Sequence, residues 1–212
     1  MYDAVLFDLD VTLIDSESVA IRTGLAAFDT LGHAVEPDFL HAMIGKDQPT
    51  SARMIASAMP HLDIERLNSI WAHGFQSAMA DQVPLKPQVH EVLGAISLPI
   101  GLVTSSRRHE ARTKMAGAAL DTYFARVVVL EDVAAAKPAP DPYLLAARLL
   151  GVDPARCLVF EDSETGAESA HRAGCVVVQV PDIVPSSGRW AHHVAPDLWS
   201  GAMAAGLRLA QG

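Results

Sequence analysis

The stretch Ala4-Val-Leu-Phe-Asp8-Leu-Asp10-Val-Thr12 decides the fold, because a short apolar run ends here in a turn that carries two acids. A continuous apolar run of this length is typical of a strand that is buried on both faces. Beyond it, Ile21, Leu25 and Phe28 follow helical spacing, and Gly32 is a helix stop. Only helical patterns continue from there to residue 80. The chain therefore starts with one buried strand and then leaves the sheet for a helical insertion.

The character of the sequence changes after residue 84. Short apolar runs at 99–104, 127–130, 158–160 and 176–180 alternate with helical segments near 87–97, 107–119, 142–150 and 164–173. Asp141-Pro142 is a helix start and Gly151 is a helix stop. Strands that alternate with helices predict a parallel sheet with helices on both faces. We therefore predict an α/β fold with a Rossmann-like parallel sheet core, residues 1–14 and 82–212, and an inserted all-helical cap domain, residues 15–81.

The composition excludes several classes of protein. The 212 residues carry a formal net charge of −9, whereas a nucleic-acid partner needs clusters of Lys and Arg. No apolar run approaches the ~18 residues of a membrane span, and the N-terminus lacks the basic segment of a signal peptide. Cys157 and Cys175 each open an apolar run, which predicts small buried side chains, and we interpret His192-His193 as a surface turn. We expect a cytoplasmic protein, a monomer or weak homodimer, with no nucleic-acid or membrane partner.

Polar side chains gather where the predicted strands end. The first strand leads into Asp8 and Asp10, the next into Thr104-Ser105-Ser106, the third into Lys137, and the fourth into Glu161-Asp162. Because ligands bind at the carboxyl ends of parallel strands, we expect these groups to converge on one edge of the sheet. Crowded carboxylates repel one another, and a hard cation such as Mg²⁺ relieves that repulsion. A lysine beside Mg²⁺ would form a cationic site for a phosphoryl group.

These four segments, in this order, resemble the four motifs of the haloacid dehalogenase superfamily, and the resemblance covers the whole core. Asp15-Ser-Glu17 and Val180-Pro-Asp182 are typical of its subfamily I, which has a small helical cap and includes phosphatases and β-phosphoglucomutase. The resemblance implies a magnesium-dependent phosphatase that acts on a small phosphorylated metabolite, such as a sugar phosphate, through an aspartyl phosphate. One residue departs from the pattern, since Val11 stands where this subgroup usually has Gly, which tolerates a positive φ.

The resemblance also implies a role for each motif residue. Asp8 would be the nucleophile, and Asp10 would be the general acid and then the general base. Thr104 would hydrogen-bond the phosphoryl oxygens, and Lys137 would balance the charge on Asp8. The groups expected to hold Mg²⁺ are the carboxylates of Asp8, Asp162 and Glu161 and the backbone carbonyl of Asp10.

Substrate recognition is expected from both parts of the chain. The residues predicted to contact substrate are Ser105, Ser106 and Arg107 in the core and Lys46 and Arg53 in the cap. Similar enzymes meet their substrate at the corresponding part of the cap. An equally simple interpretation of Lys46 and Arg53 is that they are solvated charges at helix ends.

Two alternatives remain: a sugar phosphomutase similar to β-phosphoglucomutase, and a non-catalytic binding protein of the same fold. A binding protein has no need of Asp10, so the intact set of acids disfavours it. In β-phosphoglucomutase-like sequences an Arg lies three positions after a cap Gly, and a His lies early in the first cap helix. Here Gln48 follows Gly45 by three positions, and Ser16-Glu-Ser-Val-Ala20 contains no His. The sequence therefore favours hydrolysis over return of the phosphoryl group to a sugar.

Overall fold

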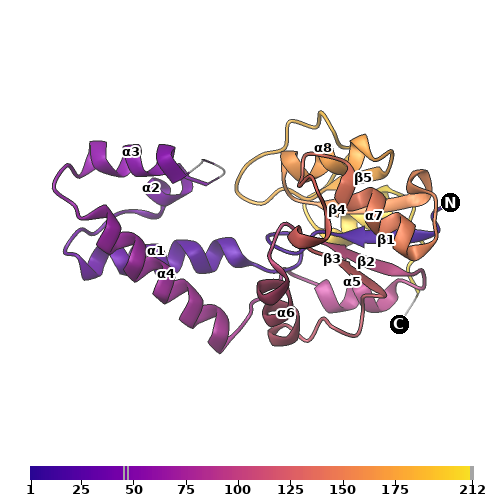
Figure 1. The fold of residues 1–212 in the computed structure, drawn as a ribbon, viewed down its shortest axis with the longest axis horizontal. Helices are drawn as coiled ribbons and strands as arrows, with labels where there is room; N and C mark the ends of the chain where they lie inside the picture. The colour runs from indigo at the N-terminus through magenta and orange to yellow at the C-terminus, as the bar shows by residue number, and fades with distance from the viewer. Residues whose placement is uncertain (45, 47, 211–212) are drawn as a thin grey trace. The chain divides into compact units, whose positions relative to one another are not determined.

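The strands form a single parallel sheet. The computed structural model describes residues 1–44, 46 and 48–210. Among these residues the strands are β1 (Ala4–Phe7), β2 (Ile100–Val103), β3 (Arg126–Val128), β4 (Cys157–Glu161), β5 (Val176–Gln179) and β6 (His193–Val194). They lie in the order β3-β2-β1-β4-β5-β6, and every neighbouring pair is parallel. Figure 1 labels β1 to β5. The predicted Rossmann-like α/β fold is confirmed.

The helices fall into two groups along the chain. The first group follows β1 and consists of α1 (Ser16–Thr30), α2 (Pro37–His41), α3 (Gln48–Ala58) and α4 (Ile64–Asp81). The second group accompanies the later strands and consists of α5 (Val89–Ala95), α6 (Arg108–Gly117), α7 (Asp141–Leu150), α8 (Glu164–Arg172) and α9 (Leu198–Ala204). As the sequence indicates, Pro142 lies in the first turn of α7, and Gly151 ends that helix with a φ of 74°. Asp141, which the sequence predicts as the cap, is instead the first residue of the helix, and Pro140 occupies the N-cap position.

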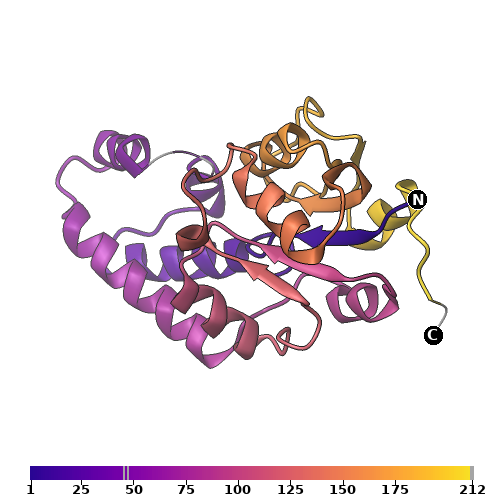
Figure 2. The same ribbon diagram turned by 45° about the vertical axis from the view of Figure 1, so that its right-hand side comes forward.

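Both faces of the sheet are buried. Alternate side chains of a strand point to opposite faces. Leu6 and Val159 belong to a buried cluster with residues of α7 and α8, the two orange helices beside the sheet in Figure 2. On the other face Phe7 stacks on Phe160 with ring centroids 4.8 Å apart. Every residue of β1, β2 and β4 is buried. This burial explains why those strands are continuous apolar runs in the sequence.

The chain divides into two compact units. Met1–Asp15 and Leu85–Gly212 form the unit that contains the sheet, and Ser16–Pro84 forms an all-helical unit. The helical unit has its own apolar cluster, which includes Phe28 and Leu67. Its residues also line a half-open cavity of about 320 Å³. Within the described residues, no helix is both long enough and apolar enough to cross a membrane.

The region around His192 differs from its interpretation as a surface turn. His193 and Val194 form strand β6, which pairs with β5. His192 lies at the start of this pairing, where its backbone N–H donates to the Val177 carbonyl at 2.8 Å. Its Nδ1 accepts a hydrogen bond from the Val177 backbone N–H at 3.0 Å. A strand of two residues is too short to show alternation, so only its pairing partner reveals it.

Candidate active site

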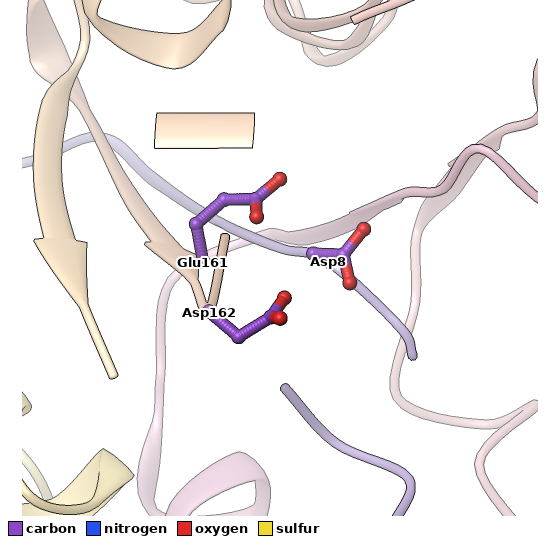
Figure 3. Close-up of side chains that lie close together, drawn as sticks. All are labelled: Asp8, Glu161 and Asp162. Atoms are coloured by element: carbon purple, nitrogen blue, oxygen red, sulfur yellow. The ribbon is translucent and has the colours of Figure 1, made fainter. Parts of the chain in front are cut away.

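Strands β1 and β4 lie side by side where the strand order reverses, with β2 and β3 beyond β1 and with β5 and β6 beyond β4. Such a reversal leaves a crevice at the carboxyl ends of the strands, where ligands bind in open α/β sheets. Asp8 directly follows β1, Glu161 ends β4, and Asp162 comes next. Each of the three offers a carboxylate oxygen, and these oxygens lie within 4.8 Å of one another (Figure 3).

Lys137 lies among these acids with only 5% of its side chain exposed. Its Nζ donates to Asp8 Oδ1 at 2.7 Å, to Glu161 Oε1 at 2.6 Å and to the backbone carbonyl of Val103 at 2.9 Å. These contacts use all three donors of the ammonium group. Burial lowers the pKa of Lys137, but the attraction of Asp8 and Glu161 outweighs burial and raises it above its usual value. Lys137 is therefore a fixed positive charge beside Asp8.

The acids outnumber this one buried cation. Burial raises the pKa of Asp8 well above its usual value, against the opposing effect of Lys137, and the charges of Glu161 and Asp162 add to the rise. Burial and then the charge of Glu161 raise the pKa of Asp162 to about 7. Several carboxylate oxygens that face one another around a single lysine are a donor set suited to a hard divalent cation. The residues present therefore fit such an ion.

Glu161 is held by groups that sequence reasoning missed. The hydroxyl of the fully buried Tyr143 in α7 donates to Glu161 Oε1 at 2.6 Å, and Ser163 Oγ donates to Oε2 at 3.2 Å. Gly166 in α8 leaves room for the carboxylate, since a Cβ at this position would lie 1.8 Å from Glu161 Oε1. In the sequence Tyr143 reads as one more apolar residue of a helix. No local signal marks it as a partner of an acid.

Asp10 lies in a different setting from Asp8. Ser106 Oγ donates to Asp10 Oδ2 at 2.8 Å. Lys114, in the last turn of α6, donates from Nζ to Oδ1 at 2.6 Å and to Oδ2 at 2.8 Å. The side chain of Asp10 is 31% exposed. The structure thus gives each of the two acids in the first motif its own lysine, and the second of these lysines was not among the predicted residues.

The turn that carries Asp10 contains a strained residue. Val11 has a φ of 68°, in the left-handed region that a β-branched residue rarely occupies. Its backbone N–H donates to the carbonyl of Ile14 at 2.8 Å, which closes the turn. Thr12 Oγ1 donates to Asp162 Oδ1 at 3.2 Å and so ties the same turn to the acid cluster. The backbone therefore adopts here the conformation for which Gly is best suited.

The segment after β2 contains three predicted substrate contacts. Thr104 is buried, and its hydroxyl oxygen accepts a hydrogen bond from the Ser106 backbone N–H at 3.0 Å. The hydroxyl hydrogen of Thr104 is not used in that contact and can be offered to a ligand. Ser105 and Arg107 are exposed, and the backbone N–H of Arg107 donates to the Glu110 carboxylate at 3.2 Å at the start of α6. Of this segment, Ser106 is the residue that contacts a predicted catalytic acid.

The two predicted cap contacts, Lys46 and Arg53, belong to the helical unit. Both are exposed. Lys46 lines the cavity of about 320 Å³, together with mostly apolar side chains that include Trp71. Arg53 Nη2 donates to Thr50 Oγ1 at 2.9 Å. Gly45, from which the mutase comparison is counted, lies outside the described residues.

Comparison with known proteins identifies the family. A family model described as haloacid dehalogenase-like hydrolase matches residues 5–180, which include most of β1, all of β4 and the whole acid cluster. The chain belongs to this family. It is 32% identical over 184 residues to the fructose-1-phosphate phosphatase YqaB of Escherichia coli, covering 84% of this chain and 96% of the relative. It is 35% identical over 189 residues to hexitol phosphatase A of Escherichia coli, covering 82% of this chain and 81% of the relative.

Solved structures of haloacid dehalogenase-like proteins share the fold. A hydrolase of this family from Deinococcus radiodurans, with bound phosphate and sodium, superposes with a TM-score of 0.87 at 25% identity, and 99% of each chain is covered. A β-phosphoglucomutase from Clostridium difficile has a TM-score of 0.64 at 19% identity, covering 92% of this chain and 91% of that one. The latter likeness shows the fold alone. The predicted superfamily is confirmed, and the relatives named as phosphatases support the predicted phosphoric monoester hydrolase.

Proposed function

We propose that the protein hydrolyses a small phosphate monoester, a sugar phosphate or a similar metabolite, through an aspartyl phosphate on Asp8 with Mg²⁺ as cofactor. The observation that carries this proposal is the position of Asp8. Its carboxylate follows β1 at the switch point of the sheet, 2.7 Å from the buried Lys137, and faces the acids at the end of β4. This arrangement supplies a nucleophile, a fixed positive charge and oxygen ligands for a cation at one place.

The mechanism follows from the two acids of the first motif. An oxygen of Asp8 attacks phosphorus, and the bond from phosphorus to the ester oxygen breaks. Asp10 donates a proton to the departing oxygen, and in the second half it accepts a proton from the water that attacks the aspartyl phosphate. Inorganic phosphate leaves and the Asp8 carboxylate is restored. Lys137 offsets the negative charge that gathers on Asp8 and on the phosphoryl oxygens, to which Thr104 would donate its hydroxyl hydrogen.

Mg²⁺ would be held mainly by Asp8 and Asp162, together with the backbone carbonyl of Asp10. When bound, this ion neutralises the carboxylates and the phosphoryl oxygens. Glu161 already accepts hydrogen bonds from Lys137, Tyr143 and Ser163. Its main contribution would therefore be to fix Lys137 and to add negative charge, since about three of its four acceptor sites are used.

The substrate class rests on the relatives and on the helical unit. We propose that Ser16–Pro84 acts as a cap that recognises the part of the substrate beyond its phosphate, with Lys46 and Arg53 as candidate contacts. The phosphatases named for fructose 1-phosphate and for hexitol phosphates make phosphorylated C6 sugars and polyols the first compounds to test.

The test is a screen for release of inorganic phosphate. Hexose 1- and 6-phosphates, hexitol phosphates and phosphoglycolate are incubated with the protein in Mg²⁺, in EDTA and with the Asp8→Asn variant. We expect phosphate from a subset of the sugar and polyol phosphates in Mg²⁺ only. We also expect turnover in Asp8→Asn to fall at least about a thousandfold, since an amide cannot replace the nucleophile. A variant that stays within tenfold of the wild type would place the nucleophile elsewhere.

The same screen distinguishes hydrolysis from the phosphomutase alternative. If β-glucose 1-phosphate is turned rapidly into glucose 6-phosphate with little release of phosphate, the proposed hydrolysis is wrong and the mutase is right. The helix α1 begins Ser16-Glu-Ser-Val-Ala20 with no His, which favours hydrolysis. If the protein binds phosphorylated sugars but converts none of them, it is the non-catalytic binding protein of the same fold.

A further inference from the structure

Lys114 and Ser106 clamp the carboxylate of Asp10. Lys114 Nζ lies 2.6 Å from Oδ1, 2.8 Å from Oδ2 and 3.1 Å from Ser106 Oγ. Ser106 Oγ in turn donates to Oδ2 at 2.8 Å. Lys114 and Asp10 are 104 positions apart in the sequence. The clamp therefore depends on the tertiary structure, which brings the last turn of α6 close to the turn that follows β1.

The contacts are distributed unevenly over the two oxygens of Asp10. Within the part of the chain that the structure describes, Oδ2 accepts from both Ser106 and Lys114, whereas Oδ1 accepts from Lys114 alone. Each carboxylate oxygen has two acceptor sites, so Oδ2 is fully used and Oδ1 keeps one site. A carboxylate held in this way presents Oδ1, in a single orientation, to a group that approaches from outside the clamp.

Proton transfer in catalysis requires such fixed geometry. A general acid must lie within hydrogen-bond reach of the atom that it protonates, and a displacement of about 1 Å can cost about a hundredfold in rate. Asp10 is 31% exposed and lies in a turn next to the strained Val11. Such a side chain would sample several rotamers if nothing held it.

We propose that Lys114, with Ser106, is a positioning residue for Asp10, and that Oδ1 of Asp10 is the atom that handles the proton in both halves of the reaction. This inference rests on the proposed function, in which Asp10 protonates the departing ester oxygen. Lys114 is not assigned to the phosphoryl group. Lys137 already fills that position beside Asp8 with three contacts of its own.

Two esters with different leaving groups test the proposal. p-Nitrophenol leaves as a stable anion and needs no proton, whereas phenol, with a pKa of about 10 like Tyr, leaves far more easily when it is protonated. The quantity compared is kcat/KM, because it covers the steps up to departure of the leaving group and excludes the later attack of water. The proteins are the wild type, Lys114→Met, Lys114→Arg and the control Arg112→Met, which removes an exposed charge from the same helix.

We expect Lys114→Met to lower kcat/KM for phenyl phosphate by about 10- to 100-fold, a part of the usual contribution of general acid catalysis. For p-nitrophenyl phosphate the loss should stay below about threefold, because the leaving group needs no proton. Lys114→Arg should recover most of the lost rate, since its guanidinium also donates to a carboxylate. Arg112→Met should match the wild type on both esters, and thermal unfolding of all four proteins verifies the fold.

Equal losses on the two esters would show that Lys114 binds the phosphate or supports the fold, and would overturn the positioning role. An unchanged rate on both esters would make the pair a surface salt bridge without effect on catalysis, which also overturns it. A wild type that releases phosphate neither from these esters nor from any compound of the metabolite screen would instead remove the proposed phosphatase function itself. The failure of the inference is thus distinguishable from the failure of the function beneath it.

Discussion

Asp8 and Asp10 stand two residues apart in one motif, yet the fold places them in opposite settings. The side chain of Asp8 is 10% exposed and pairs with Lys137, whose own side chain is 5% exposed. The side chain of Asp10 is 31% exposed, and its partner Lys114 is 18% exposed. The proposed nucleophile, Asp8, is therefore held in a buried network. Asp10, the proposed general acid and base, lies in a more exposed position, as proton exchange with a departing group and with water would require.

This contrast has a physical reason. Residues that follow a buried central strand remain enclosed for one or two positions and then turn outwards, so a D-x-D pattern spans the boundary between core and crevice. Burial strengthens every electrostatic interaction around Asp8. Partial exposure weakens those around Asp10 by solvent screening. An Asp–Lys ion pair is therefore expected to contribute more to the free energy of unfolding at Asp8 than at Asp10.

Removal of the two lysines tests this difference most directly. Lys137→Met should lower the free energy of unfolding by about 3–5 kcal/mol, because it leaves buried carboxylates without their cation. Lys114→Met should lower it by less than about 1 kcal/mol, as expected for a partly exposed pair. Chemical denaturation of both variants in EDTA measures the two values. Equal losses would show that the two settings do not differ in energy.

The pH dependence of stability tests how strongly burial and the neighbouring carboxylates disfavour the charged form of Asp162. The folded pKa of Asp162 is raised to about 7 from its ordinary 3.8, so the folded state holds this proton more tightly than the unfolded state. Stability should therefore fall as pH rises from about 4 to about 7, by an amount on the order of 3 kcal/mol from this group. Asp162→Asn removes the effect.

The measurement is the unfolding free energy of wild type and Asp162→Asn in EDTA between pH 4 and pH 8. At pH 8 the variant should have the higher free energy of unfolding. This difference should vanish towards pH 4, where Asp162 of the wild type is protonated. Mg²⁺ should stabilise the wild type more at pH 8 than at pH 5, because it binds the charged cluster. An advantage that is independent of pH would contradict the raised pKa.

Packing around the buried site offers a third test. Gly166→Ala places a Cβ within 2 Å of the Glu161 carboxylate, which must then leave Lys137 and Tyr143. We expect a loss of about 1–3 kcal/mol in unfolding free energy and a lower kcat. Gly94→Ala in α5 is the matched control, since its Cβ would meet nothing within 4 Å. That change should be neutral or slightly stabilising.

The smallest expected effect concerns the turn between the two settings. Val11→Gly relieves a positive φ that costs roughly 1–2 kcal/mol for a residue with a Cβ. The greater flexibility of Gly in the unfolded chain offsets about 0.5–1 kcal/mol of this gain. We expect a net rise of less than about 1 kcal/mol in the unfolding free energy, measured by denaturation. Val11→Ala retains the strain, so a similar gain in that variant would point to another cause.

Much of this arrangement could be predicted from the sequence, because it depends on local signals. Buried parallel strands are continuous apolar runs, and the residues that follow them must meet at one edge of the sheet, which is why Asp8, Lys137 and Asp162 were predicted together. Helix boundaries at Asp141-Pro142 and at Gly151 also follow from short-range rules. The family resemblance added roles to these positions, and the predicted superfamily is confirmed.

The remaining features are decided by tertiary contacts. Lys114 reads in the sequence as an ordinary basic residue in the last turn of a helix, and only the packing of α6 brings it to Asp10. Tyr143 becomes a hydrogen-bond donor to Glu161 only when α7 packs on the sheet. Strand β6 exists only because β5 pairs with it. Propensity and periodicity act over a few residues, whereas these contacts join segments tens of residues apart, and no local pattern encodes such a pairing.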